Sequence, residues 1–239
     1  MESLSLDLLV LEPSDRFELE TGPHEAAIVP LTGSVTIEAG GKTYSLKRRD
    51  VFTDKASALC LPRDARAVFF AEAYTELALC KARTSEAGSV IFIPKEGVKE
   101  KTVGRDSWER KVVDIIDRQV DAKRIVLGET FNKPACWSSF PPHKHDTSIP
   151  GVEAKMEEIY LFRINPPQGF GTQTIYKNGS SSTFTIKDYD AVTIPWGYHP
   201  VSASPGTSLY YLWFLAGKDR ELRPNTDPDF RFLEERANA

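Results

Sequence analysis

Short runs of alternating apolar and polar residues follow one another along most of the chain. The runs are rich in Val, Ile, Thr, Tyr and Phe, and Gly, Pro, Asp or Asn residues separate them. A period of two residues between apolar positions is typical of half-buried β-strands. The pattern predicts strands at residues 34–40, 42–48, 65–73, 123–131, 157–164, 172–176, 182–188, 191–197 and 208–217. Many short strands and few helical stretches favour an all-β sandwich or barrel.

Two segments lack a clear period. Residues 107–120 combine the Val and Ile content of a strand with the charge pattern of a helix. The final residues, DFRFLEERANA, suit either a short helix or a tail. The pattern alone does not decide between these alternatives.

A weak internal repeat divides the chain. Each half contains, in the same order, a strand, a glycine turn, a strand, an Asp, a strand, a Pro and a further strand. Asp50 in the first half corresponds to Asp190 in the second, and Pro62 corresponds to Pro195. This order is typical of jelly-roll barrels, whose hairpins close two sheets around a small cavity. The repeat therefore predicts two jelly-roll β-barrels in tandem.

The polar stretch at residues 94–107 is the expected connection between the two barrels. Accordingly, we assign residues 1–100 to an N-terminal barrel and residues 101–239 to a C-terminal barrel.

Composition excludes several classes of partner. The chain has 41% hydrophobic and 27% charged residues, which is ordinary for a globular protein. A net charge of -4 and a pI near 5.7 provide no basic surface for nucleic acid or for an anionic membrane. The N-terminus is acidic where a signal peptide is basic, and the three cysteines are odd in number without CxxC spacing. We therefore expect a cytoplasmic protein that binds neither nucleic acid nor membrane.

Histidine is rare in the chain, and three of the four histidines occur at informative positions. His143 and His145 are separated by one residue, so in a strand both imidazoles lie on one face and Lys144 lies on the other. His199 follows a strand and a turn, from which a third imidazole can reach the same barrel cavity. Together these residues indicate a metal site. His24 has no histidine neighbour, so we expect the N-terminal barrel to be metal-free.

A carboxylate is expected to complete the site and to leave one or two positions open for water or substrate. Glu157 and Glu158 begin the strand EEIYLFRI and point to opposite faces, so only one of them can be the ligand. If Glu157 is the ligand, Arg163 shares the metal face. If Glu158 is the ligand, Tyr160 and Phe162 share it. The pattern leaves both choices open.

Four long motifs stand in the second half of the chain: WSSFPPHKHD at 137–146, MEEIYLFRINPPQGFGTQTIY at 156–176, IPWGYHPVSASPGTSLYYLWFLAG at 194–217 and DPDF at 227–230. Through these motifs the sequence resembles a known family, the 5-deoxy-glucuronate isomerases of myo-inositol catabolism. These enzymes are bicupins related to the 5-keto-4-deoxyuronate isomerases of pectin breakdown. The close match covers residues 123–232, and the first half shares only the general cupin pattern.

The resemblance implies one divalent metal ion, zinc or manganese, held by His143, His145, His199 and Glu157. In the related isomerases the ligand glutamate follows a Met and precedes an aromatic strand, as Glu157 does in this sequence. Glu158 is the alternative ligand. The insertion DTSIPGVEAKM leaves a third candidate, Glu153. The same donor set also suits Fe, Co or Ni.

The resemblance further implies a metal-dependent aldose–ketose isomerase that converts 5-deoxy-D-glucuronate to 5-dehydro-2-deoxy-D-gluconate without a redox cofactor. Arg163 shares the face of Glu157, and its planar guanidinium suits the carboxylate of a small anionic sugar acid. Tyr211 is a second expected substrate-binding residue. The general base is left open among Tyr160, Tyr198, Tyr211 and the second glutamate.

Other functions fit the same residues. One alternative is the 5-keto-4-deoxyuronate ketol-isomerase of pectin breakdown. A non-catalytic sugar-binding cupin and an Fe(II) dioxygenase are two more. A homo-oligomer is a further expectation, because the edge strands of barrels commonly pair.

Overall fold

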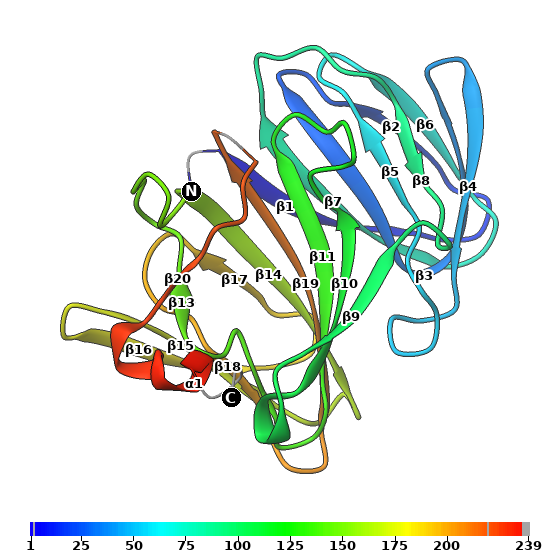
Figure 1. The fold of residues 1–239 in the computed structure, drawn as a ribbon. Helices are drawn as coiled ribbons and strands as arrows, with labels where there is room; N and C mark the ends of the chain where they lie inside the picture. The colour runs from blue at the N-terminus through cyan, green and yellow to red at the C-terminus, as the bar shows by residue number, and fades with distance from the viewer. Residues whose placement is uncertain (2, 219, 236–239) are drawn as a thin grey trace. The chain divides into compact units, whose positions relative to one another are not determined.

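The computed structural model of the chain describes residues 1, 3–218 and 220–235, and its regular elements are dominated by β-strands (Figure 1). The strands are β1 (Leu4–Leu11), β2 (Arg16–Glu20), β3 (His24–Ala39), β4 (Lys42–Arg48), β5 (Ala58–Leu61), β6 (Arg66–Ala71), β7 (Thr75–Arg83), β8 (Ile91–Ile93), β9 (Lys99–Val103), β10 (Arg110–Ile116), β11 (Ile125–Asn132), β12 (Trp137–Ser138), β13 (His143–Lys144), β14 (Met156–Asn165), β15 (Gly171–Lys177), β16 (Ser180–Ile186), β17 (Ala191–Ile194), β18 (Val201–Ala203), β19 (Ser208–Gly217) and β20 (Asn225–Thr226). The helical elements are the 3-10 turns η1 (Asp106–Trp108) and η2 (Pro228–Phe230) and the helix α1 (Phe232–Glu235). The predicted all-β class is confirmed.

The structure decides the segments that the pattern left ambiguous. Residues 107–120 contain the end of η1 and then β10, so the Val and Ile content indicated the strand correctly. The described part of the final segment forms α1, and residues 236–239 lie outside the described residues. The expected connection at 94–107 contains a strand, β9, which the pattern did not predict. Four of its five residues are exposed and it is largely polar, so it shows no apolar alternation.

The chain forms two compact units. The first contains Met1–Lys99 and Asp114–Leu127, and the second contains Glu100–Val113 and Gly128–Ala239. The division into domains at residue 100 stays a prediction. What the structure adds is that a later segment of the chain packs with the first unit.

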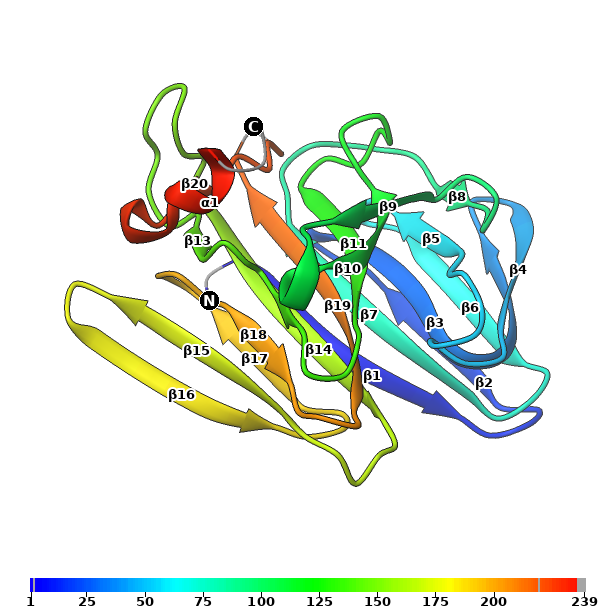
Figure 2. The ribbon, with the colours of Figure 1, turned by 60° about the horizontal axis from the view of Figure 1, so that its bottom comes forward.

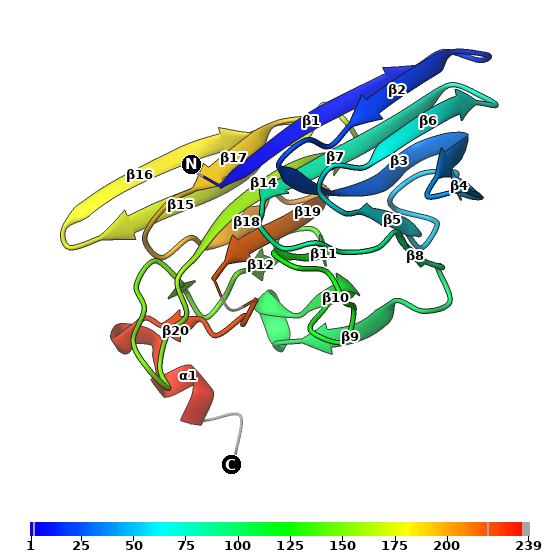
Figure 3. The same ribbon diagram turned by 90° about the horizontal axis from the view of Figure 1, so that it is seen from above.

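Eight strands form the sheet of the first unit. Its main path is β1-β7-β3-β5-β8, while β4 and β6 both pair with β3, and β2 pairs with β6. Figure 3 shows β2 beside β6 at one end of this unit. The long strand β3 pairs with β7 in its first half and with β4 and β6 in its second half. One strand therefore contributes to both layers of the barrel.

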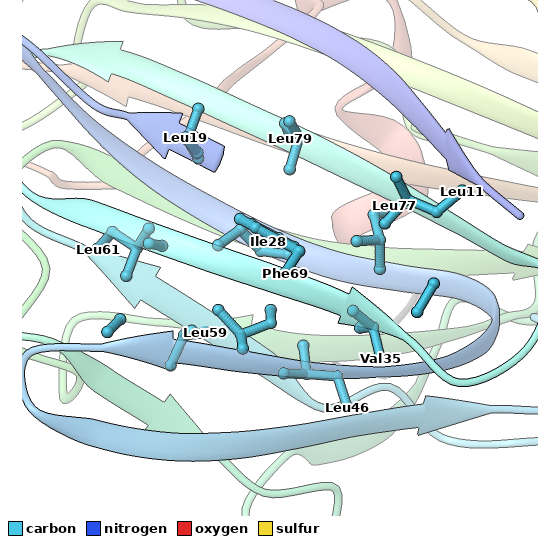
Figure 4. Close-up of a cluster of buried hydrophobic side chains, with 14 residues drawn as sticks. Leu11, Leu19, Ile28, Val35, Leu46, Leu59, Leu61, Phe69, Leu77 and Leu79 are labelled. Atoms are coloured by element: carbon cyan, nitrogen blue, oxygen red, sulfur yellow. The ribbon is translucent and has the colours of Figure 1, made fainter. Parts of the chain in front are cut away.

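The core of the first unit is apolar. Figure 4 shows side chains from β3, β5, β6 and β7 gathered inside the sheet, among them Ile28, Leu59, Phe69 and Leu77. All four are fully buried. Burial of this apolar surface is the main stabilising contribution to such a barrel.

A buried carboxylate fastens the later segment to this unit. Glu25 on β3 is 2% exposed, and its oxygens accept hydrogen bonds from the backbone N–H groups of Lys123, Arg124 and Ile125 at 2.7, 2.7 and 2.5 Å. Hydrogen bonds to an ionised carboxylate are stronger than those between neutral groups. This contact explains why residues that follow β10 pack with strands about one hundred positions earlier in the chain.

The second unit contains three sheets or parts of sheets. The six-stranded sheet has the order β17-β14-β19-β11-β10-β9, and the four-stranded sheet has the order β12-β18-β15-β16. Figure 2 shows β15 and β16 as a long hairpin beside β18. The short strands β13 and β20 form a separate pair. The strand β14 pairs with β17 and β19, and the residues on both of its faces are largely buried.

Within the part of the chain that the structure describes, no helix has the length and apolar character required to cross a membrane.

The burial of the core predicts that two neighbouring phenylalanines on β6 contribute differently to the free energy of unfolding. Phe69 is fully buried, whereas Phe70 is 37% exposed. We expect Phe69→Ala to lower the free energy of unfolding by about 3–5 kcal/mol, because it opens a cavity in the core. Phe70→Ala is the matched control and should cost less than about 1 kcal/mol. Urea unfolding followed by circular dichroism measures both, and equal losses would contradict the assignment of the core.

Candidate metal centre

The two histidines of the HxH motif enter the site from a short strand. Antiparallel pairing aligns His143 with Thr226 and Lys144 with Asn225. Extended backbone then puts His143 and His145 on one side and Lys144 on the other, as the spacing predicted. His199 reaches the same place from the turn between β17 and β18. The centroid of its ring lies 4.9 Å from that of His143 and 5.0 Å from that of His145.

A glycine permits the turn that carries His199. Gly197 has a φ of +86°, and a Cβ atom there would lie 2.9 Å from the carbonyl oxygen of Tyr176. Its N–H donates to Asp146 at 2.8 Å, and its carbonyl oxygen accepts from the Nδ1 of His199 at 2.9 Å. Only glycine combines this backbone conformation with so close an approach.

All three imidazoles are oriented in the same way. In each ring Nδ1 lies within hydrogen-bond distance of a backbone carbonyl oxygen, which can only accept. Nδ1 therefore carries the proton, and Nε2 presents its lone pair. Such anchoring of the second ring nitrogen is typical of histidines that bind metals. The three pairs are His143 with Pro141 at 3.1 Å, His145 with Met156 at 2.9 Å and His199 with Gly197 at 2.9 Å.

Glu158 supplies the carboxylate of the cluster. Its Oε2 lies 2.9 Å from the Nε2 of His145 and 3.3 Å from the Nε2 of His199. All three side chains are buried, and their donor atoms lie within 4.8 Å of one another. The Nε2 of His199 is a buried atom with no hydrogen-bond partner. Lone pairs directed at a carboxylate repel it unless a cation or a proton lies between them.

The structure does not place the expected ligand Glu157 in this cluster. Glu157 precedes Glu158 on β14, so its side chain points to the opposite face of the sheet. The third candidate, Glu153, is buried elsewhere and accepts a hydrogen bond from Lys144 at 2.5 Å. Of the three glutamates, only Glu158 lies with the imidazoles.

Burial controls the charge of the rings. It lowers the pKa of His143 to about 4, with a smaller effect from the neighbouring His145. Burial likewise holds the pKa of His199 well below its usual range. For His145 burial also disfavours the charged form, but the Glu158 carboxylate outweighs it and raises the pKa. At neutral pH the rings of His143 and His199 are therefore neutral, which is the form that binds a metal.

A cavity of about 190 Å³ opens next to these rings. Residues from β10, β14 and β19 contribute to its wall, among them Tyr160 and Tyr211. The Oγ of Ser139 lies 2.9 Å from the hydroxyl of Tyr160 and 3.4 Å from that of Tyr211. The Tyr211 hydroxyl donates to Ser138 at 2.9 Å. A connected set of hydroxyl groups thus borders the cavity.

Two of the candidates for the general base lie outside this cavity. Tyr198 packs against Tyr176, with ring centroids 5.2 Å apart, and it is not part of the cavity wall. Glu157 is on the opposite face of β14. Tyr160 and Tyr211 remain, and burial raises the pKa of each phenol above its usual value.

The structure places Arg163 away from the cavity in which it was expected to bind the substrate. The Nε of Arg163 donates to Asp188 at 3.0 Å, and its guanidinium lies 3.8 Å from the ring centroid of Tyr189. The cause is the same alternation that excludes Glu157, because both side chains point to the same face of β14.

A different arginine lines the cavity. Arg110 begins β10 and is 9% exposed. Sequence reasoning missed it because it lies in the segment whose strand or helix character was ambiguous. Its position in the run WERKVV carries no signal of burial, since arginine is usually exposed.

A comparison with known families matches residues 1–233 to the KduI/IolB family. The chain belongs to this family. It is 34% identical to a 5-deoxy-glucuronate isomerase from Geobacillus kaustophilus, over 98% of this chain and 87% of the relative. It is 29% identical to a 5-deoxy-glucuronate isomerase from Bacillus subtilis, over 96% of this chain and 87% of the relative. Membership therefore places the chain among isomerase enzymes.

Solved structures agree with this assignment. An IolB-like protein from Salmonella typhimurium LT2 superposes with a TM-score of 0.94 at 28% identity, over 98% of this chain and 90% of that chain. An oxalate decarboxylase from Bacillus subtilis superposes with a TM-score of 0.65 at 14% identity, over 100% of this chain and 76% of that chain. The second likeness concerns the fold alone, which is that of the cupin proteins.

Behind the site of this KduI/IolB chain lies a buried ionic network. Lys144 donates to Glu153 at 2.5 Å and to Asp146 at 3.0 Å. Asp146 also accepts from Lys177 and from the backbone of Gly197, both at 2.8 Å. The network therefore ties the HxH strand, the inserted loop and the turn before His199 to one another. Despite the cost of burial, the two carboxylates raise the pKa of Lys144.

We expect Lys144→Met to lower the free energy of unfolding by about 3–5 kcal/mol, because it leaves the buried carboxylate of Glu153 without its cation. Lys177→Met is the matched control. Its side chain is 29% exposed and pairs with Asp146, so its loss should cost at most about 1 kcal/mol. Denaturant unfolding of both variants checks this, and a Lys144→Met cost no larger than the control would contradict the role of the network.

Proposed function

We propose that the chain is a metal-dependent aldose–ketose isomerase that converts 5-deoxy-D-glucuronate to 5-dehydro-2-deoxy-D-gluconate in myo-inositol catabolism. The names of its relatives support the substrate, because several of them are 5-deoxy-glucuronate isomerases of about 30% identity that match nearly the whole chain. The observation that carries the proposal is the convergence of the imidazole nitrogens of His145 and His199 on the carboxylate of Glu158, with the Nδ1 of each ring held by a backbone carbonyl oxygen.

The proposed ligands are the Nε2 atoms of His143, His145 and His199 and the carboxylate of Glu158. The orphaned Nε2 of His199 supports this set, since a buried nitrogen without a partner is costly unless something binds it. Three imidazoles and one carboxylate suit zinc or manganese. His143 joins the set because its ring lies beside that of His199 and its Nδ1 is anchored like the others.

The reaction moves one proton from C2 to C1 and a second from O2 to O1, with no net change in oxidation state. A divalent ion held by these residues would act as a Lewis acid toward the two oxygens. Tyr160 keeps its proton at neutral pH because burial and the nearby Glu158 raise its pKa. It therefore serves as a hydrogen-bond donor to a sugar oxygen as negative charge develops there.

Ser139 connects Tyr160 to Tyr211, and Tyr211 donates onward to Ser138. These contacts hold the Tyr160 hydroxyl in place as a hydrogen-bond donor. The wall also contains apolar side chains such as Leu215 and Trp213, which limit the access of water to the reacting carbons.

Replacing one of two adjacent glutamates tests the proposed site. We expect Glu158→Gln to lower metal affinity by more than about 10-fold, the loss that even outer-shell changes produce, and to abolish isomerisation. Glu157→Gln, one residue away on the opposite face, should retain metal and activity. Metal content by mass spectrometry and a ketose assay measure both, and the reverse result would restore Glu157 as the ligand.

The substrate is tested with purified, metal-loaded protein. We expect 5-deoxy-D-glucuronate to be converted to a keto acid, and chelation of the metal to stop the conversion. Faster turnover of 5-keto-4-deoxyuronate would assign the chain to the pectin branch instead. Tight binding of either uronate without turnover would show a sugar-binding protein and refute the proposed isomerase.

A further inference from the structure

Arg110 is a buried cation whose charge nothing so far explains. Its side chain lines the cavity of about 190 Å³ together with His143, His145 and Glu158. The other cation of the cavity wall is Lys101, an exposed residue. Arg110 itself is 9% exposed. Burial lowers its pKa, and a buried guanidinium is normally compensated by an anion.

Neutral groups alone hold Arg110. Its Nη1 donates to the carbonyl oxygens of Phe140 at 2.8 Å and of Trp108 at 3.1 Å. Within the described residues it forms no ion pair, and neither Nε nor Nη2 makes a hydrogen bond to the protein. The backbone contacts thus hold Nη1 in place and leave the N–H groups of Nε and Nη2 for another partner.

Two other arginines of this barrel form ion pairs with acidic side chains. Arg163 pairs with Asp188, and Arg223 pairs with Glu221. Arg110 lies instead near the hydroxyl groups that border the cavity. The positive charge of Arg110 lowers the pKa of Tyr211 and so opposes the effect of burial. In turn Tyr211 and Tyr160 oppose the effect of burial on the pKa of Arg110, which stays below its usual value. The cation is therefore close to the groups that would contact a sugar.

We propose that Arg110 binds the carboxylate of the substrate through Nε and Nη2 and so selects sugar acids over neutral sugars. This inference rests on the proposed function, which supplies an anionic sugar. A carboxylate matches the paired donors of a guanidinium edge and neutralises its buried charge. Arg110 thus takes the role that the sequence had suggested for Arg163.

Ligand binding separates this role from a structural one. The probes are D-glucuronate and D-glucose, which differ by the carboxylate, and calorimetry measures their affinity for metal-loaded protein. For Arg110→Gln we expect binding of D-glucuronate to weaken by about 10- to 100-fold, the loss of a hydrogen-bonded charge pair. Binding of D-glucose should change less than about 2-fold, because no charge pair is lost.

Two further variants complete the experiment. Arg110→Lys keeps the charge without the paired donors and should recover part of the affinity for D-glucuronate. Arg163→Gln removes an arginine that pairs with Asp188 and should leave the preference for the acid intact. Metal content and the thermal unfolding midpoint show that each variant is folded.

Equal weakening of both sugars in Arg110→Gln would overturn the inference and leave Arg110 a support for the backbone at Phe140. Failure of the wild-type protein to prefer D-glucuronate would overturn it as well. If Arg110→Gln does not fold, Arg110→Lys provides the test. An affinity of Arg110→Lys for D-glucuronate equal to that of the wild-type protein would then overturn the inference. Arg110-dependent binding of D-glucuronate without isomerisation of 5-deoxy-D-glucuronate would uphold this inference and refute only the proposed reaction.

Discussion

The site depends on one electrostatic constraint, which is that imidazole nitrogens and a carboxylate are held close together in a dry interior. Backbone carbonyl oxygens accept from the Nδ1 of each imidazole, so in the neutral rings Nε2 directs a lone pair and not a proton at the site of Glu158. Such an arrangement of acceptors is unfavourable without a cation between them. The folding of the surrounding strands supplies the free energy that keeps these groups together. Because the arrangement is unfavourable by itself, it is evidence for a binding site.

The strand β14 determines which side chains share that site. Because successive residues of a strand point to opposite faces, the selection of Glu158 also selects Tyr160 and excludes Glu157 and Arg163. Glu157 and Arg163 are thus absent from the cluster for the same reason, which is the parity of their positions on β14. Both faces of β14 are largely buried, so neither side of the strand was marked as the exterior by its residues.

Side chains outside the cavity hold the strand, the loop and the turn of its wall in position. Lys144 points away from the metal side, yet its contacts with Asp146 and Glu153 join the strand of the two histidines to the loop that precedes β14. Asp146 in turn fixes the turn at Gly197 and hence the position of His199. The inserted loop therefore has a structural role, and the charges buried in it are compensated within the network.

The sequence by itself determined the all-β class, nine of the twenty strands that the structure describes and the shared face of His143 and His145. These features follow from local alternation, which is a property of neighbouring residues. Tertiary structure alone placed Glu158, and not Glu157, beside the imidazoles and brought Arg110 to the cavity. Both placements depend on which face of a strand contacts residues that are distant in sequence. A strand that is buried on both faces, or a single arginine, has no local sequence pattern that shows which face this is.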